Sequence, residues 1–167
     1  MTPSDDTTSG VVSKEVAATL SRPIVAILGT TSKAGEPHLT AVWYVYSEGR
    51  FLIVTPESSA KVAHIRANPT VELCINAGPV GPCITAHGVA TIVGPMTLDL
   101  LVTLAERYLG PVAGAKYVAA RNPDASSVIV SVEPRRWREW SAADQFTRDS
   151  DSVVQSHGHQ EADGGPK

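Results

Sequence analysis

The sequence predicts a mainly β protein, built as an antiparallel sheet or barrel with a few short helices. Between residues 23 and 93, short apolar runs alternate with turn residues at nearly regular spacing. Helical spacing of apolar residues is confined to a few short stretches outside these runs. With 167 residues, 43% of them hydrophobic, the chain is long enough for one domain with a substantial core.

We expect this domain to span residues 13–140. Residues 1–12 are polar and predicted to be disordered, and residues 141–167 form a polar tail that is predicted to be flexible. The tail carries His157 and His159, but two histidines on such a tail do not indicate a metal site.

The first half of the domain begins with a helix predicted over Ser13–Arg22, where Val16, Ala17 and Leu20 fall at helical spacing. A short helix is also predicted before Asn68-Pro69, because the residue that precedes a proline disfavours helix. The strands of this half are predicted over Pro23–Thr30, His38–Tyr46 and Phe51–Thr55.

The second half contains two strands, Thr70–Asn76 and Cys83–Val93, joined by a Gly- and Pro-rich turn. On one side of the second strand, small residues such as Ala86 and Gly88 suit a tight barrel interior or a close approach of backbone. The remaining predicted elements are helices over Thr97–Leu109 and Ala113–Arg121, a strand over Ser126–Pro134, and an edge or crossing segment over Arg135–Trp140.

The strand predicted over His38–Tyr46 has few polar positions on either face. A strand that is apolar on both faces lies in the middle of a core or is covered by another subunit. The residues alone leave these two alternatives open.

Charge and composition exclude several classes of partner. The 14 basic and 17 acidic residues give a net charge of −3 without a basic stripe, so neither nucleic acid nor a membrane is an expected partner. The first residues lack the basic and apolar segments of a signal peptide, and no apolar stretch has membrane-spanning length. We therefore expect a soluble, cytoplasmic protein.

The sequence contains no recognisable catalytic or metal-binding motif. Cys74 and Cys83 lie in apolar runs and are expected to be buried thiols, and His38 and His87 are expected to be structural. Paired carboxylates, G-x-S-x-G and Walker motifs are missing, so no catalytic residue is assigned. Such a protein either binds a ligand or uses the chemistry of a cofactor.

The segment TPESSAKVAHIRANP, Thr55–Pro69, joins a strand to a short helix through Ser58, Ser59 and Lys61. A serine here can cap the helix by accepting from its first free backbone N–H groups. The same N–H groups, the two hydroxyls and the ammonium would also form a cradle for a phosphate. A lysine at the positive end of a helix dipole is disfavoured unless an anion binds there. Residue chemistry leaves capping and phosphate binding equally open.

The order of these segments resembles the pyridoxamine-phosphate-oxidase-like split β-barrel superfamily. The resemblance rests on ILGTTSKAGEPHLTAVWYVY, on FLIVT followed by Ser-x-Lys, and on Asn-Pro followed by TVELCI. The later ERYLG and VIVSVEPRRWREW look most like the actinobacterial branch, many of whose members use the deazaflavin F(420) in place of FMN. The resemblance covers residues 23–140 and implies a Greek-key antiparallel split β-barrel, and a homodimer with its cofactor at the subunit interface.

The resemblance also implies a set of cofactor-binding residues. In the resemblance, Ser59 and Lys61 would hold the phosphate, and Ser58 joins them from its place at the helix start. A threonine that ends a strand and the backbone of an earlier strand edge would meet the flavin-type ring. The residues are Thr40, Ala41, Val42, Thr55, Ser58, Ser59 and Lys61.

This chain departs from the FMN-using oxidases of the superfamily at several of their phosphate ligands. Ala60 stands where they commonly have Arg, and Cys83 stands where they have Gln. Thr40 and Val45 replace an Arg and a Lys of their second strand. Fewer phosphate ligands weaken the case for tight FMN binding and argue against pyridoxamine oxidation.

The leading hypothesis is therefore an oxidoreductase that transfers hydride between F(420) and an organic small-molecule acceptor. Two alternatives stay open: an FMN-dependent oxidoreductase of the same fold, and a non-catalytic binder of flavin, haem or a related tetrapyrrole. The substrate is not predictable, because the pocket would be shaped by loops and by the partner subunit.

Overall fold

The computed structural model describes residues 7–8, 12–79, 81–121 and 126–141. Its helices are α1 (Lys14–Ser21), α2 (Ala60–Ala67) and α3 (Leu98–Ala119). Its strands are β1 (Thr7–Thr8), β2 (Ala26–Thr31), β3 (Pro37–Val42), β4 (Val45–Ser47), β5 (Arg50–Pro56), β6 (Thr70–Asn76), β7 (Pro82–Pro95) and β8 (Ser127–Ser141).

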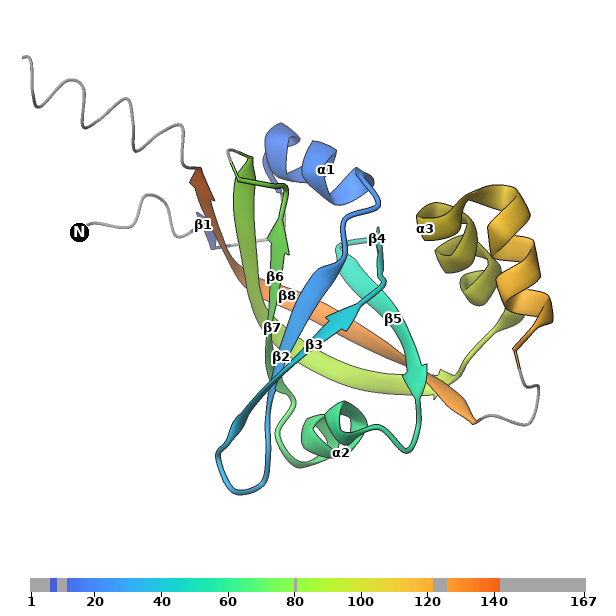
Figure 1. Ribbon diagram of the computed structural model, residues 1–167. Coiled ribbons are helices and arrows are strands. Elements are labelled where there is room, and N and C mark those ends of the chain that lie inside the picture. Colours follow the sequence, from blue (N-terminus) through green and yellow to red (C-terminus); the bar gives the residue numbers. More distant parts are fainter. Residues whose placement is uncertain (1–6, 9–11, 80, 122–125, 142–167) are drawn as a thin grey trace, which may run out of the picture.

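The strands form one antiparallel sheet that curls into a split barrel (Figure 1). The order along the sheet is β3-β2-β6-β7-β8-β5-β4, and β1 pairs with β8 outside this path. The long strands β7 and β8 pair along almost their whole length and form the middle of the sheet. The predicted mainly β split barrel is confirmed.

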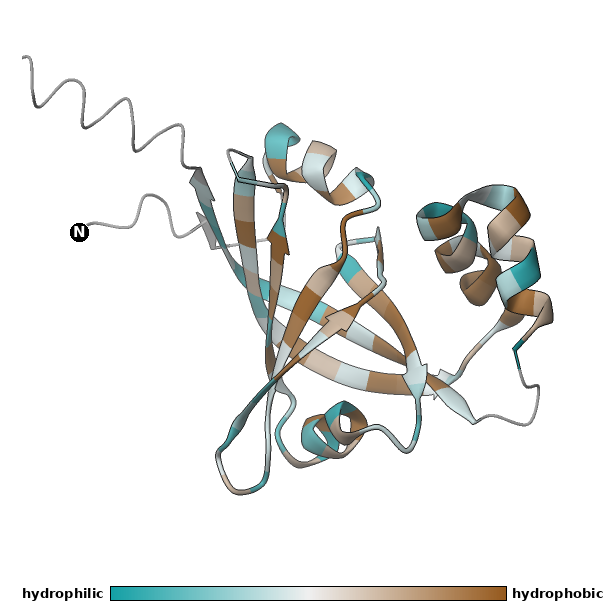
Figure 2. Ribbon diagram, viewed as in Figure 1, coloured by the Kyte–Doolittle hydropathy of each residue, from teal (hydrophilic) through white to brown (hydrophobic). Residues whose placement is uncertain are grey.

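The core lies inside the curl of the sheet, because alternate residues of β2, β5 and β6 are buried. Hydrophobic residues run along these strands in the ribbon (Figure 2). Leu73 of β6 and Ile84 and Ala86 of β7 are fully buried there, as the alternation predicts. Gly88 continues the same face, and a side chain at this position would collide with the backbone of Glu133. The close backbone approach predicted from the small residues of β7 is present.

The strand predicted over 38–46 is divided in two, because Trp43 and Tyr44 leave the sheet between β3 and β4. The backbone N–H of Tyr44 donates to Oη of Tyr108 at 3.2 Å, and this hydroxyl in turn donates to the carbonyl of Ile24 at 3.1 Å. The Trp43 ring stacks on Tyr108 with 5.0 Å between centroids. Partners from α3 thus replace sheet partners, and the chain turns the corner that brings β4 to β5.

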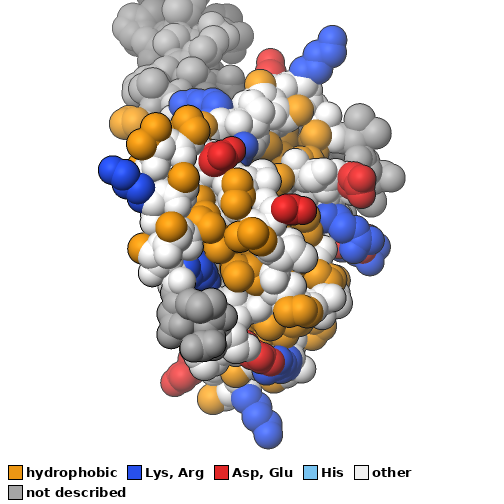
Figure 3. All heavy atoms as spheres, turned by 90° about the vertical axis from the view of Figure 1, so that its right-hand side faces the viewer, with side chains coloured by type: hydrophobic (Ala, Val, Ile, Leu, Met, Phe, Trp, Pro, Cys, Tyr) orange, Lys and Arg blue, Asp and Glu red, His pale blue; other side chains and the backbone are white. Residues whose placement is uncertain are grey.

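Helix α3 lies beside the barrel and carries both of the helices predicted between residues 97 and 121. They are separated by a bend at Gly110, whose φ of 78° and ψ of 167° are not helical. On the side of the molecule that carries α3, hydrophobic side chains gather between scattered charges (Figure 3). On α3 itself, Leu98 is 64% exposed and Val112 is 72% exposed.

Helix α1 forms as predicted, with Val16 and Leu20 buried, but Ala17 is exposed and Thr19 is buried in its place. Most of residues 1–12 and of the tail 141–167, predicted to be disordered and flexible, lie outside the described residues. No helix in the described ranges is long and apolar enough to cross a membrane.

Candidate functional site

Three of the predicted cofactor-binding residues meet at the start of α2. Thr55, near the end of β5, is only 3% exposed. Its Oγ1 lies 3.3 Å from Oγ of Ser59 and accepts a hydrogen bond of 3.2 Å from Nζ of Lys61. We call this cluster of Thr55, Ser59 and Lys61 the cradle.

Ser59 occupies the N-cap position of α2 without capping it through its side chain. Its carbonyl accepts from the backbone N–H of Val62 at 3.0 Å, as an N-cap carbonyl does, while its hydroxyl contacts Thr55 instead of the helix. The first N–H groups of a helix have no partner inside the helix. At α2 these include the N–H groups of Ala60 and Lys61, so the start of this helix presents donors beside an ammonium.

The cradle holds a cation that is partly removed from water. Burial lowers the pKa of the Lys61 ammonium below its ordinary value. The ion pairs found among the described residues do not include Lys61. An ammonium beside hydroxyls and helix N–H groups, without a carboxylate of its own, is suited to binding an anion.

The remaining predicted residues lie nearby in the turn and on a different strand. Ser58 is exposed in the turn that precedes α2. Thr40, Ala41 and Val42 end β3, which pairs with β2 on one side and with no other strand in the described part of the chain. The structure therefore does not bring these three residues into hydrogen-bond contact with the cradle, but their strand edge is unpaired.

Two histidines connect β3 with α2. Oγ1 of Thr40 lies 3.2 Å from Nδ1 of His38, and the rings of His38 and His64 meet edge to face with 5.3 Å between centroids. Nδ1 of His64 lies 3.1 Å from Oγ1 of the buried Thr30. His64 follows Lys61 by three residues on α2, so the two side chains share a face of the helix. The histidine pair thus joins the predicted ring strand to α2, the helix that carries Lys61.

Sequence reasoning did not single out His64, and it treated His38 as structural. The spacing of three residues between Lys61 and His64 was a usable signal, because the Lys61 face of the helix was already a candidate site. That His38 would face His64 depended on the fold, since the two residues come from separate elements.

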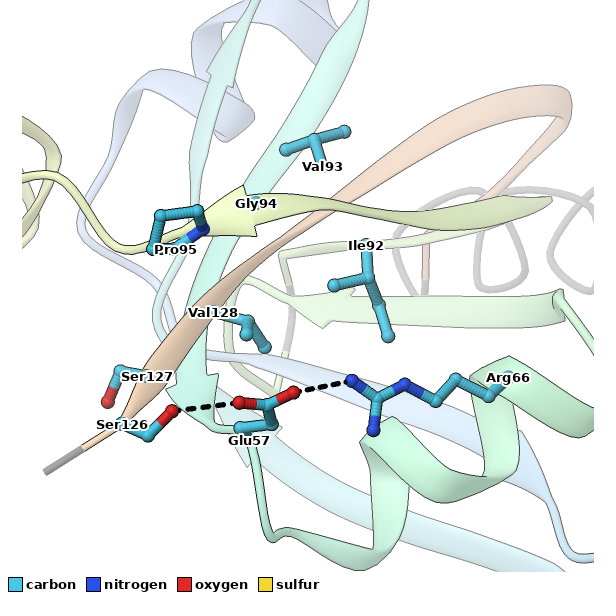
Figure 4. Close-up of a pocket in the computed structure, with 9 residues that line it drawn as sticks. All are labelled: Glu57, Arg66, Ile92, Val93, Gly94, Pro95, Ser126, Ser127 and Val128. Atoms are coloured by element: carbon cyan, nitrogen blue, oxygen red, sulfur yellow. Dashed lines mark hydrogen bonds and ion pairs between the residues drawn. The ribbon is translucent and has the colours of Figure 1, made fainter.

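A separate hollow of about 350 Å³ lies between the end of β7, the start of β8 and the side of α2 that carries Arg66 (Figure 4). There the carboxylate of Glu57 accepts hydrogen bonds from Arg66 at 2.7 Å and from Ser126 at 2.8 Å. These hydrogen bonds lower the pKa of Glu57, and the bond from Arg66 has the largest effect. The guanidinium of Arg66 already has an anionic partner, in contrast to the ammonium of Lys61. The lining residues are Glu57, Arg66, Ile92, Val93, Gly94, Pro95, Ser126, Ser127 and Val128, none of them a predicted site residue.

The two cysteines are half-buried, which corrects the expectation of buried thiols. Both lie on the outer face of the sheet, because they alternate with the inward residues Ile75 of β6 and Ile84 of β7. Within the described residues, no cluster of three or more His, Cys, Asp or Glu side chains could hold a metal ion.

Comparison with known proteins assigns the family. The sequence profile described as Pyridoxamine 5'-phosphate oxidase matches residues 12–141. The chain belongs to this family. The resemblance to the pyridoxamine-phosphate-oxidase-like superfamily is therefore confirmed, and a search of curated proteins gives no match.

Several solved structures share the fold. An F(420) reductase is 24% identical, with a TM-score of 0.63 over 76% of this chain and 98% of that chain. A conserved hypothetical protein from Mycobacterium tuberculosis is 27% identical, with a TM-score of 0.64 over 83% of this chain and 90% of its own. An FMN-binding protein from Nostoc punctiforme, related to pyridoxamine 5'-phosphate oxidase, is 17% identical, with a TM-score of 0.56 over 75% of this chain and 81% of its own. Haem-binding proteins also occur among the similar structures.

Proposed function

We propose that the protein is an oxidoreductase that transfers hydride between the deazaflavin F(420) and an organic small-molecule acceptor. The observation that carries this proposal is the cradle, in which a partly desolvated ammonium and two hydroxyls stand at the start of a helix that lacks a side-chain cap. Membership in a family related to flavin-type cofactors supports a phosphate-bearing ligand there.

Each residue of the site has a role that follows from its position. Lys61, Ser59 and the exposed Ser58 would bind the cofactor phosphate, together with the free N–H groups of α2. The ring of the cofactor would be oriented by Thr55 and by the backbone at the edge of β3. That edge consists of Thr40, Ala41 and Val42. The bound cofactor would supply the hydride chemistry, and the protein would supply binding, orientation and exclusion of water.

F(420) is favoured over FMN because the cradle has only one cation. Ala60 is the exposed first residue of α2. An arginine at this position could bind further phosphate oxygens through its guanidinium, and alanine cannot. The hydroxyl of Thr40 is hydrogen-bonded to His38 and offers no positive charge. The structural similarity to an F(420) reductase is consistent with this choice.

We further propose that the cofactor lies at the interface of a homodimer. The outer face of β3 is apolar, with Leu39 72% exposed and Ala41 exposed beside it. Ile27 lies opposite Ala41 in the β2–β3 register and is 38% exposed, so the apolar surface continues onto β2. Size-exclusion chromatography with light scattering should show a dimer, and Leu39→Asp should shift the protein to a monomer. A wild-type monomer would remove this part of the proposal.

The deciding experiment is a pair of titrations of the purified protein with F(420) and with FMN, followed by fluorescence. We expect F(420) to bind more tightly, and Lys61→Ala to weaken its binding. Tighter binding of FMN would replace F(420) by FMN in the proposal. Binding of neither cofactor would remove the oxidoreductase assignment.

The histidine pair favours a second candidate, a haem-binding protein without redox catalysis. The rings of His38 and His64 are in contact between β3 and α2, and imidazole is a common axial ligand of haem iron. Titration with haemin should then give a sharp Soret band that is lost in His38→Ala or His64→Ala and kept in the control His87→Ala. A band that survives in all three variants would remove this candidate.

A further inference from the structure

Two thiols face each other across the β6–β7 pair. Sγ of Cys74 lies 3.6 Å from Sγ of Cys83, so the sulfur atoms are in contact. In the register of the strands Cys74 stands opposite Thr85, and Cys83 stands opposite Asn76. The cysteines are therefore diagonal neighbours on the same face of the sheet, which is within reach of side chains on adjacent strands.

We propose that Cys74 and Cys83 form a redox-active dithiol, which closes to an intramolecular disulfide when a small-molecule disulfide such as oxidised glutathione is present. This inference rests on the thiol pair alone and is independent of the cofactor assignment.

The position of the pair allows the bond to form with little movement. The two Sγ atoms are 3.6 Å apart, and a disulfide needs a separation of about 2.05 Å. The sulfur atoms must therefore approach each other by about 1.5 Å. Cys83 is the second residue of β7, directly after the hairpin turn that joins β7 to β6. Both side chains are partly exposed in the single chain.

The two thiols have different parts in the reaction. Burial, followed by the neighbouring Cys83 thiol, raises the pKa of Cys74 to about 11, so Cys74 is protonated at neutral pH. In the proposed order, the thiolate of Cys83 attacks the small disulfide first, forming a mixed disulfide and releasing one thiol. Cys74 then gives up its proton and attacks the Cys83 sulfur, which releases the second thiol. In total the protein loses two hydrogens and one small disulfide is reduced to two thiols.

The bond would act on an exposed apolar part of the sheet. Ile27 stands opposite Cys74 on β2 and is 38% exposed, and Trp140 stands opposite Cys83 on β8 and is 55% exposed. Closing the disulfide ties β6 to β7 between these two side chains.

The test uses the full-length protein in glutathione buffers of increasing oxidised fraction, with thiol counting and intact mass. We expect both thiols to disappear together, with a loss of two hydrogens and no bound glutathione, and dithiothreitol should restore them. Cys74→Ser and Cys83→Ser should each stop at a stable glutathione adduct, which forms more slowly on the Cys74 thiol of Cys83→Ser. A wild-type protein that keeps both thiols, or that carries glutathione at either cysteine at equilibrium, would overturn the proposal.

A second measurement separates the folded arrangement from the proximity of the two residues in sequence. Closure of the mixed disulfide should be faster in the folded protein than in the same chain in urea, because the sheet holds the sulfur atoms in contact. Equal or slower closure in the folded state would show that the fold does not build the pair, and would also overturn the proposal.

Discussion

Helices α1 and α2 have the same length and both begin after a serine, but the two serines have different partners. Ser13 caps α1, because its Oγ accepts from the backbone N–H of Val16 at 3.1 Å. Ser59 stands at the equivalent position of α2, and its hydroxyl contacts Thr55 instead. The first turn of α1 also carries Glu15, which complements the helix dipole, while α2 has no acidic residue there and has Lys61.

The difference shows that one helix start is satisfied by its own residues and the other is not. Helix α3 behaves like α1, since Thr97 caps it at 3.4 Å and Asp99 lies in its first turn. Among the helices of the described residues, only α2 lacks a side-chain cap and an acidic first turn. The same short pattern of serine before a helix thus has two outcomes, and the neighbouring strand end decides which one occurs.

The largest expected effect separates the lysines at the two helix starts. Lys61→Ala should weaken F(420) binding about 10- to 150-fold, the range for losing a hydrogen bond to a charged group. Lys14→Ala, at the first residue of the capped helix α1, is the matched control and should leave the affinity unchanged. Isothermal titration of wild type, Lys61→Ala and Lys14→Ala with F(420) measures the three affinities. Equal affinities of wild type and Lys61→Ala would show that α2 does not hold the phosphate.

A gain of function tests the same helix start from the opposite direction. Ala60→Arg should tighten FMN binding by about 1–2 kcal/mol, because it adds a guanidinium beside the single cation of the cradle. The measurement is an FMN titration by fluorescence, with Ala63→Arg, an exposed position on the next turn of α2, as the control. An improvement of the same size in the control would attribute the effect to general charge.

The strands and the inward residues of the sheet could be predicted because they depend on local alternation. Val71, Leu73 and Ile75 of β6 are buried as the pattern indicates. The break between β3 and β4 could not be predicted in this way. It depends on Tyr108, which reaches Tyr44 from 64 residues further along the chain.

In the candidate site, too, local features could be predicted from the sequence, and contacts between distant elements could not. Ser59 and Lys61 were found because they lie within one short segment whose chemistry is visible in the sequence. That Ser59 would contact Thr55 rather than cap α2 depends on how β5 enters the helix. The contact of His38 with His64 depends on packing between β3 and α2, which no local pattern records.

The two serines themselves give a smaller and opposite pair of effects. Ser13→Ala should lower the unfolding free energy by about 1 kcal/mol, which is about 2–4 °C in Tm for a chain of this size, and should leave cofactor affinity unchanged. Ser59→Ala should leave Tm nearly unchanged and weaken F(420) binding about 2- to 10-fold, as for a neutral hydrogen bond. Thermal unfolding and titration of both variants decide this. A loss of stability in Ser59→Ala equal to that in Ser13→Ala would return Ser59 to the role of a cap.

The smallest expected effect concerns the stability of the protein without cofactor. Burial lowers the pKa of Lys61 in the folded state, so between this lowered value and the ordinary lysine pKa of about 10.4 the unfolded chain binds more protons than the folded one. Stability contributed by this group therefore rises with pH in that alkaline window, and at neutral pH the charged Lys61 costs stability. Its place at the positive end of the α2 dipole adds to this cost.

Lys61→Ala should accordingly raise the unfolding free energy of the cofactor-free protein at pH 7 by a few tenths of a kcal/mol, on the order of the helix-dipole effect. The advantage of the variant should shrink as the pH rises toward 10, because the wild-type lysine then loses its charge in the folded state. Saturating F(420) should reverse the sign at pH 7, since only the wild type pairs the partly desolvated ammonium with the phosphate. Denaturant unfolding across this pH range, with and without cofactor, measures the effect at pH 7, its change with pH and its reversal by the cofactor. If Lys61→Ala instead lowers stability without cofactor, the hydrogen bond to Thr55 outweighs the cost of burial, and the cradle is a structural feature of the strand–helix turn.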